Sequence, residues 1–257
     1  MQFNGAIFDV DGVLVDTPHE QAWRESLERL MTGEWLSIAP ETIYTAHGLT
    51  TAVYQEYVAG KPRESGARAA LDYFHVPDPD GARLQQYMAQ KQALIEELIV
   101  RGEFTVFPDA LRFLLRMKSY GLKLAAASSS KNANKFLSKI DVGAFVANGG
   151  MQDEALTFTL PPQLSMLDMF DANVCGQPFA HGKPAPDIFL GAAAAIPLSP
   201  AACFVVEDAS SGIQAAKAGG MYAIGVARLH DEALLEAAGA DQIVTSLDAV
   251  DVDLLLG

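Results

Sequence analysis

The chain has 257 residues, 50% of them hydrophobic and 19% charged, and can therefore bury one large core or two smaller ones. Its formal net charge of -14 at pH 7 argues against electrostatic binding to nucleic acid or to an anionic membrane surface, because both are polyanions. With only two cysteines and no apolar run as long as a membrane helix, we expect a cytoplasmic protein without a disulfide framework, zinc site or targeting segment.

Apolar runs of strand length open the chain and recur in its second half, where they alternate with longer segments of helical pattern. The runs lie at residues 3–10, 122–127, 202–206 and 222–226. This alternation is typical of βαβ units on a parallel sheet. We therefore predict an α/β fold whose core is a doubly wound, Rossmann-like parallel sheet formed by both ends of the chain.

The strand signal is missing between Thr17 and Glu103, where apolar residues follow helical spacing instead. The segments with this spacing are residues 19–31, 65–74 and 82–100. They predict an inserted α-helical cap domain at residues 17–104, and a core domain made of residues 1–16 and 105–257. Residues 141–163 show no clear periodicity, and we assign them no role.

The first apolar run ends in Asp9-Val10-Asp11-Gly12. Side chains at positions i and i+2 of a strand share a face, so the two carboxylates are expected to point the same way at its carboxyl end. Two acids on one face repel each other unless a cation or a shared proton relieves them, and this arrangement suits phosphoryl transfer with a metal ion. The alternative is that the Asp-Gly pair is only a turn that ends the strand.

A second run of small residues ends in three serines, Ser128 to Ser130, followed by Lys131 and Asn132. Hydroxyls and free backbone N–H groups at a strand end can hold phosphate oxygens. The alternative is that a serine here only caps the next helix.

Two further segments carry charge at places that suit the same chemistry. Lys183 precedes two prolines that restrict where its ammonium can point, and a fixed cation can neutralise a transferring phosphoryl group. Another apolar run ends in Glu207-Asp208, and such hard oxygen ligands suit Mg²⁺. The alternatives are a solvated surface lysine and a helix cap at Asp208.

In their order and context, these segments resemble the four motifs of the haloacid dehalogenase superfamily of phosphatases and phosphomutases, over the whole chain except residues 141–163. The resemblance implies that Asp9 is the nucleophile that becomes phosphorylated and that Asp11 is the acid/base. It implies that Ser128 and Lys183 hold the phosphoryl group. It further implies a magnesium site made by Asp9, the Asp11 carbonyl and Asp208, with Glu207 as a direct ligand or one step removed.

The helical insertion is similar to that of the β-phosphoglucomutase-like subfamily. The similarity rests on His19 four residues before Trp23, on Arg63 in the run Gly-Lys-Pro-Arg, and on Lys91 in the last long helix. It implies that these side chains bind the substrate, with Arg63, Ser130, Lys131 and Asn132 as candidates for holding the phosphate that does not react. The alternative is that they are ordinary helix and surface residues.

The leading hypothesis is a monomeric, Mg²⁺-dependent enzyme that interconverts hexose 1-phosphate and 6-phosphate through an aspartyl phosphate at Asp9 and a bisphosphate intermediate. The first alternative is a sugar-phosphate phosphatase, which releases inorganic phosphate. The second is a catalytically inactive protein that binds sugar phosphates, which the complete set of nucleophile, acid/base, cation and metal residues disfavours.

Overall fold

The computed structural model describes residues 2–151 and 154–257, and the chain divides into two compact units. One unit, here called the core unit, consists of Met1–Asp16 and Thr105–Gly257. The other, here called the helical unit, consists of Thr17–Phe104.

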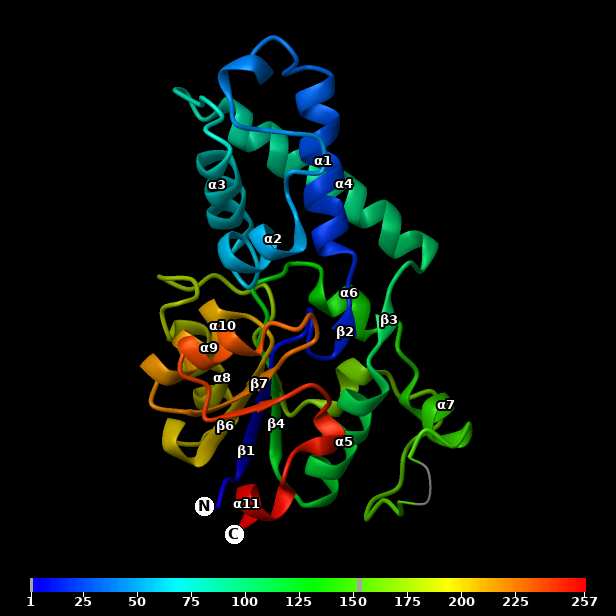
Figure 1. Cartoon of the computed structure of the whole chain (residues 1–257). Coiled ribbons are helices and arrows are strands. Elements are labelled where there is room, and N and C mark those ends of the chain that lie inside the picture. Colours follow the sequence, from blue (N-terminus) through cyan, green and yellow to red (C-terminus); the bar gives the residue numbers. More distant parts are fainter. Residues whose placement is uncertain (1, 152–153) are drawn as a thin grey trace. The chain divides into compact units, whose positions relative to one another are not determined.

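A six-stranded parallel sheet forms the centre of the core unit, with the strand order β5-β4-β1-β6-β7-β8. Figure 1 labels its inner strands β4, β1, β6 and β7. The strands are β1 (Gly5–Phe8), β4 (Lys123–Ala126), β5 (Ala172–Asn173), β6 (Cys203–Glu207), β7 (Tyr222–Val226) and β8 (Gln242–Val244). The predicted α/β fold with a parallel sheet is confirmed. The sheet also contains β5 and β8, which the sequence did not indicate, and β1 is shorter than the apolar run at 3–10.

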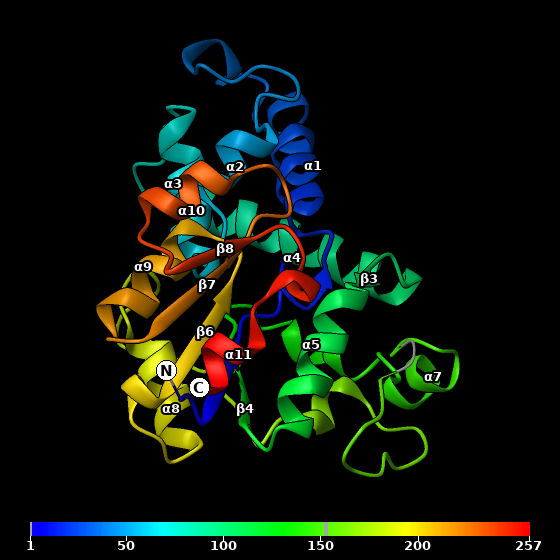
Figure 2. The ribbon, with the colours of Figure 1, turned by 60° about the horizontal axis from the view of Figure 1, so that its bottom comes forward.

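Helices cover both faces of this sheet, as a doubly wound fold requires (Figures 1 and 2). On one face Ile7 and Val205 pack into a buried cluster with residues of α8 and α9. On the other face the ring of Phe113 in α5 lies 6.1 Å from Phe8 and 6.2 Å from Phe204. The helices of the core unit are α5 (Pro108–Ser119), α6 (Ala133–Leu137), α7 (Val142–Ala147), α8 (Asp187–Ala195), α9 (Ser210–Ala218), α10 (Glu232–Ala237) and α11 (Val252–Leu256), with 3-10 turns at η2 (Met166–Met169), η3 (Pro200–Ala202) and η4 (Leu247–Ala249).

A second, two-stranded sheet joins the segments through which the chain leaves and re-enters the core unit. Strands β2 (Val15–Asp16) and β3 (Thr105–Val106) pair antiparallel, with Val15 opposite Val106. The two segments on either side of the helical unit are thus tied to each other by backbone hydrogen bonds.

The helical unit contains α1 (His19–Thr32), η1 (Ala39–Glu41), α2 (Thr51–Tyr57), α3 (Arg63–Tyr73) and α4 (Ala82–Arg101). Its core is a cluster of apolar side chains from these helices. Trp23 of α1 and Tyr87 of α4 pack edge to face with their rings 5.0 Å apart, and the Tyr87 hydroxyl donates a hydrogen bond of 2.9 Å to the Trp23 carbonyl. Among the described residues, no helix is both long and apolar enough to cross a membrane.

Candidate active site

The polar residues singled out in the sequence follow three neighbouring strands of the large sheet. Asp9 comes directly after β1, Ser128 shortly after β4, and Glu207 and Asp208 at the end of β6. Strand β1 lies between β4 and β6, in register with both. Because parallel strands end at the same edge of a sheet, residues far apart in the sequence meet there.

Lys183 lies between two of these carboxylates. Its Nζ donates a hydrogen bond of 2.7 Å to Asp9 Oδ1 and a second, very short one to Glu207 Oε1. The three side chains are buried, and that of Lys183 is fully inaccessible. A lysine that could have been a solvated surface charge is therefore a fixed cation beside the predicted nucleophile.

Glu207 uses both of its carboxylate oxygens inside the protein. Oε1 contacts Lys183, and Oε2 accepts a hydrogen bond of 2.8 Å from the Ala209 N–H. The space for this carboxylate depends on Gly212 in α9, because a Cβ at that position would overlap Glu207 Oε1. In this structure Glu207 holds Lys183 in place, while its predicted part in binding metal stays a prediction.

Lys183 provides one positive charge beside the carboxylates of Asp9, Glu207 and Asp208, and the pKa values of Asp9 and Asp208 are raised. Burial, reinforced by Glu207 and Asp11, raises the pKa of Asp9 from 3.8 to about 7, although Lys183 acts to lower it. Burial together with Glu207 and Asp9 also holds the pKa of Asp208 well above its usual value. Burial acts to lower the pKa of Lys183, but Asp9 and Glu207 outweigh it and raise the pKa. The site therefore holds a charged lysine among more carboxylates than that lysine can neutralise.

The segment from Ser128 to Asn132 contacts the loop that follows β1 through the Ser128 hydroxyl. Ser128 Oγ donates a hydrogen bond of 2.9 Å to Asp11 Oδ2 and accepts one of 3.0 Å from the Ser130 N–H. Ser130 Oγ in turn accepts a hydrogen bond of 3.2 Å from the N–H of Asn132, which is buried. Lys131, between them, is exposed. The predicted phosphate holder and the predicted acid/base are thus direct neighbours.

Gly176 supports this segment, although no sequence motif singled it out. Its N–H donates a hydrogen bond of 2.8 Å to the Ser128 carbonyl, its φ is +67°, and a Cβ there would lie 3.0 Å from Lys131 Cα. A glycine is required because the backbones approach closely in a left-handed conformation. In the sequence Gly176 is an isolated glycine outside the predicted elements, and nothing local marks its close approach to Lys131.

Three of the substrate-binding residues predicted in the insertion lie together within the helical unit. Lys91 Nζ is 3.2 Å from His19 Nδ1 and lies over the Trp23 ring at 4.9 Å from its centre. All three side chains are buried. Arg63, at the start of α3, is half-buried, and burial lowers its pKa while Glu96 acts in the opposite direction. The substrate-binding roles of these residues stay predictions.

The residues present fit a magnesium ion. No group of three or more His, Cys, Asp or Glu side chains in residues 2–151 and 154–257 forms a metal cluster, and the predicted donor set does not need one. It consists of the Asp9 and Asp208 carboxylates and the Asp11 carbonyl, and Mg²⁺ in phosphoryl-transfer enzymes is typically held by one or two carboxylates with water and substrate phosphate. Asp208 Oδ2 lies where a Cβ on Gly12 would fall, so the carboxylate sits against the Asp11-Gly12 backbone. The raised pKa values of Asp9 and Asp208 indicate excess negative charge that a divalent cation would relieve.

We expect the stabilisation by Mg²⁺ to grow with pH. Since the folded-state pKa of Asp9 is about 7 and its ordinary value is 3.8, the metal-free protein binds a proton that the unfolded chain has lost, and its stability falls as pH rises from about 4 through 7. Mg²⁺ binds the ionised carboxylate, so it should raise the melting temperature by several degrees at about pH 8 and by much less at about pH 5. Thermal melts with EDTA or Mg²⁺ at the two pH values measure this.

Two variants sharpen the metal experiment. Asp208→Asn should lose the Mg²⁺-dependent rise in melting temperature. Asp141→Asn removes the charge of the side chain that caps α7 by accepting the Ala144 N–H at 2.9 Å, and should keep that rise. An equal Mg²⁺ effect at both pH values, or one that persists in Asp208→Asn, would contradict the proposed ligands.

The parallel sheet, with Asp9, Lys183 and Glu207 buried at its carboxyl edge, is the fold and site of an α/β enzyme that transfers phosphoryl groups. Over residues 3–220 the chain matches the family described as haloacid dehalogenase-like hydrolases. The chain belongs to this family and, within it, to the β-phosphoglucomutase-like subfamily. The family implies a divalent metal, typically Mg²⁺.

Relatives with two different activities have similar sequence identity to this chain. A β-phosphoglucomutase of Bacillus subtilis is 30% identical over 258 residues, which cover 97% of this chain and 92% of the relative. A fructose-1-phosphate phosphatase of Escherichia coli is 29% identical over 229 residues, covering 88% and 97%. The crystal structure of an archaeal β-phosphoglucomutase from Pyrococcus has a TM-score of 0.66 and 32% identity, covering 97% of this chain and 96% of that one. Similarity therefore assigns the phosphotransfer chemistry and leaves the acceptor to be determined.

Proposed function

We propose that this enzyme interconverts hexose 1-phosphate and hexose 6-phosphate through an aspartyl phosphate at Asp9, with Mg²⁺ as its cofactor. The observation that carries the proposal is the buried contact between Lys183 and Asp9, beside the hydrogen bond from Ser128 to Asp11. A carboxylate nucleophile, a fixed cation and a second carboxyl group are the parts that phosphoryl transfer in two steps requires.

In the first step, a carboxylate oxygen of Asp9 attacks a phosphorus atom of the donor, which is a sugar bisphosphate for a mutase and a sugar monophosphate for a phosphatase. The bond from that phosphorus to the sugar oxygen breaks. Asp11 in its protonated form gives its proton to the leaving oxygen. The Lys183 ammonium neutralises charge on the phosphoryl oxygens, and the Ser128 hydroxyl with nearby N–H groups orients them. Bound Mg²⁺ would supply further positive charge to offset the negative charge of the phosphoryl oxygens.

In the second step, a hydroxyl group attacks the aspartyl phosphate while Asp11 takes its proton. A mutase gives this role to the other hydroxyl of the sugar monophosphate, which yields a bisphosphate that then returns one phosphate to Asp9. We propose His19, Trp23, Arg63 and Lys91 as substrate-binding residues, because the buried Lys91 ammonium offers a positive charge to a phosphate or sugar oxygen. Lys131 and Asn132 complete the proposed set, with Ser130.

A sugar-phosphate phosphatase is the second candidate, and the fructose-1-phosphate phosphatase at 29% identity favours it. Both reactions form the same aspartyl phosphate. They differ only in whether a sugar hydroxyl or water receives the phosphoryl group.

The acceptor is identified by supplying β-glucose 1-phosphate, Mg²⁺ and a trace of glucose 1,6-bisphosphate, and then measuring glucose 6-phosphate and inorganic phosphate. We expect isomerised sugar to exceed released phosphate by at least about tenfold, because a positioned hydroxyl has a high effective concentration over water. Asp9→Asn purified in the same way reports any contaminating activity. Abundant phosphate without isomerised sugar would overturn the mutase proposal in favour of the phosphatase, and binding without turnover would favour an inactive sugar-phosphate binder.

A further inference from the structure

The turn that follows Asp11 is built by backbone hydrogen bonds of its own. Gly12, with a φ of +84°, donates to the Val15 carbonyl at 2.8 Å, and the Leu14 and Val15 N–H groups both donate to the Val10 carbonyl at 3.0 Å. The conformation of this turn sets the position from which Asp11 acts. The Val13 carbonyl also belongs to this turn, and it accepts a hydrogen bond from a side chain elsewhere in the core unit.

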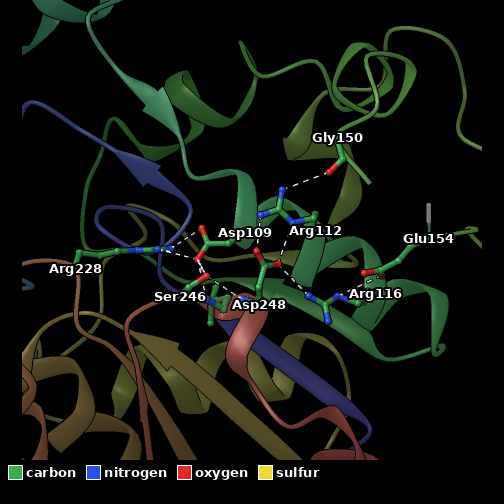
Figure 3. A network of polar contacts seen from close by, with 9 residues as sticks. Asp109, Arg112, Arg116, Gly150, Glu154, Arg228, Ser246 and Asp248 are labelled. Atoms are coloured by element: carbon green, nitrogen blue, oxygen red, sulfur yellow. Dashed lines mark hydrogen bonds and ion pairs between the residues drawn. The ribbon is translucent and has the colours of Figure 1, made fainter. Parts of the chain in front are cut away.

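The donor to Val13 is Arg228, which follows β7. One of its terminal nitrogens lies 3.3 Å from the Val13 carbonyl oxygen. The same guanidinium forms a two-pronged ion pair with Asp109, at 2.8 Å and 3.2 Å, and stacks on the Phe107 ring at 4.0 Å (Figure 3 shows the ion pair). Its side chain is 15% exposed. The planar fork of an arginine can serve a carboxylate and a carbonyl at once, which lysine cannot do in the same geometry.

Asp109 is itself held rigidly. Its Oδ2 also accepts hydrogen bonds from Ser246 Oγ at 3.0 Å and from the Leu247 N–H at 2.7 Å. Burial acts to raise the pKa of Asp109, but the hydrogen bonds from Arg228 and Leu247 outweigh it and lower the pKa. Asp109 therefore stays ionised at neutral pH and holds the guanidinium that contacts the turn.

Arg228 also touches both segments that border the helical unit. Val13 precedes β2, while Phe107 and Asp109 follow β3, and the Phe107 N–H donates to the Leu14 carbonyl at 3.0 Å. One side chain from the end of β7 thus braces the catalytic turn and the returning segment together.

We infer that Arg228 is a positioning residue for Asp11, acting through the Val13 carbonyl and held in place by Asp109. The inference rests on the proposed function, in which Asp11 is the general acid. Without the guanidinium, the turn loses the hydrogen bond at the Val13 carbonyl, and the Asp11 carboxyl group is less often placed to give its proton to the leaving oxygen.

The core unit offers a matched control in Arg112, on α5. Arg112 forms a two-pronged ion pair with Asp248, at 2.9 Å and 2.5 Å, and donates to the Gly150 carbonyl at 3.4 Å (Figure 3). Its side chain is 16% exposed, close to the value for Arg228. Arg228→Gln and Arg112→Gln each remove an arginine of similar burial from a two-pronged ion pair, although Asp248 is 40% exposed and Asp109 only 9%. Only the first substitution removes a contact with the catalytic turn.

The decisive measurement compares two phosphate donors. A sugar oxygen is a poor leaving group that needs a proton, whereas the nitrophenolate of para-nitrophenyl phosphate leaves without one. Arg228→Gln should lower kcat about ten- to hundredfold on the sugar phosphate and no more than about threefold on para-nitrophenyl phosphate, with KM nearly unchanged. Arg112→Gln should change neither kcat by more than about threefold. Equal losses on the two donors, or the same selective loss in Arg112→Gln, would overturn the inference.

A second measurement needs no turnover and so separates this inference from the proposed function. Hydrogen exchange of the Leu14 and Val15 amides, which close the turn, should be faster in Arg228→Gln and unchanged in Arg112→Gln. Arg228→Lys keeps the charge beside Asp109 and should give the same pattern in milder form if the glutamine variant fails to fold. Unchanged exchange in the turn of both Arg228 variants would overturn the positioning role, whatever reaction the enzyme performs.

Discussion

Replacing Asp9 with asparagine is expected to lower kcat by at least about ten-thousandfold, on a sugar phosphate and on para-nitrophenyl phosphate alike. The amide lacks the anionic oxygen that attacks phosphorus. Asp11 does not replace it, because its Oδ2 accepts a hydrogen bond from the Ser128 hydroxyl at 2.9 Å, whereas the Lys183 ammonium contacts Asp9. Steady-state kinetics and the mass of acid-quenched protein measure the two consequences, lost turnover and the absence of a phosphorylated protein.

The Asp9→Asn variant should remain folded, which separates the loss of chemistry from a loss of structure. Burial and the neighbouring carboxylates raise the pKa of Asp9 to about 7, so a neutral amide relieves part of the crowding, and Lys183 keeps its contact with Glu207. We expect its melting temperature in EDTA to be no lower than that of the unmodified protein. Asp11→Asn is the matched control and should still be phosphorylated by para-nitrophenyl phosphate. A phosphorylated Asp9→Asn protein would contradict the nucleophile assignment.

The residues at the sheet edge were predictable because each has a local signature. Asp9, Ser128 and Asp208 each follow an apolar run, and the end of such a run in a parallel sheet is a place where ligands bind. The strand order that makes them neighbours is not local. Nothing in the sequence alone places β1 between β4 and β6, and the family resemblance predicted only that these residues share one site.

The short strands were missed for a different reason. Strand β5 has two residues and β8 has three, which is too short for a period of two to be seen. Segment 141–163 also contains a short element, the six-residue helix α7. Residues that follow α7 form polar contacts with α5. Arg112 reaches the Gly150 carbonyl, and Arg116 forms an ion pair of 3.5 Å with Glu154. Contacts of this kind leave no hydrophobic pattern, and residues 152–153 lie outside the described part of the chain.

The partners of buried charges were the least predictable feature. Arg228 and Asp109 are 119 positions apart, and neither stands in a motif. Glu207 was predicted beside a metal because of its position after an apolar strand, yet both of its oxygens contact the protein, at Lys183 and at the Ala209 N–H. The type of residue at a strand end follows from the sequence, whereas its choice of partner depends on the loops that the fold brings over it.

Replacing Lys183 with methionine is expected to cost both activity and stability. The substitution removes the only cation shown to contact Asp9 and Glu207 in the described part of the chain. The two buried carboxylates then lose their ion-pair partner. Removing one partner of a buried ion pair typically lowers the free energy of unfolding by about 3–5 kcal/mol. Loss of the cation that neutralises the phosphoryl group should lower kcat by about a thousandfold.

The stability loss should depend on pH with a defined sign. Lys183 acts to lower the pKa of Asp9, so its removal raises a pKa that is already about 7 in the folded protein, against an ordinary value of 3.8. The folded variant therefore binds protons that the unfolded chain releases, and its stability falls as pH rises from about 4 to beyond 7. Urea denaturation in EDTA at about pH 5.5 and about pH 8 should show a larger deficit relative to the unmodified protein at the higher pH.

Lys217→Met provides the contrast for this experiment. Lys217 forms an ion pair of 2.6 Å with Asp241, but its side chain is 36% exposed, so water screens the pair. Its loss should cost less than about 1 kcal/mol. If Lys183→Met cost no more than Lys217→Met, or if its deficit were the same at both pH values, the buried carboxylates would not depend on Lys183 for their charge. The expected steep pH dependence would instead make Lys183 the residue that allows Asp9 to be ionised, and hence nucleophilic, inside the folded protein.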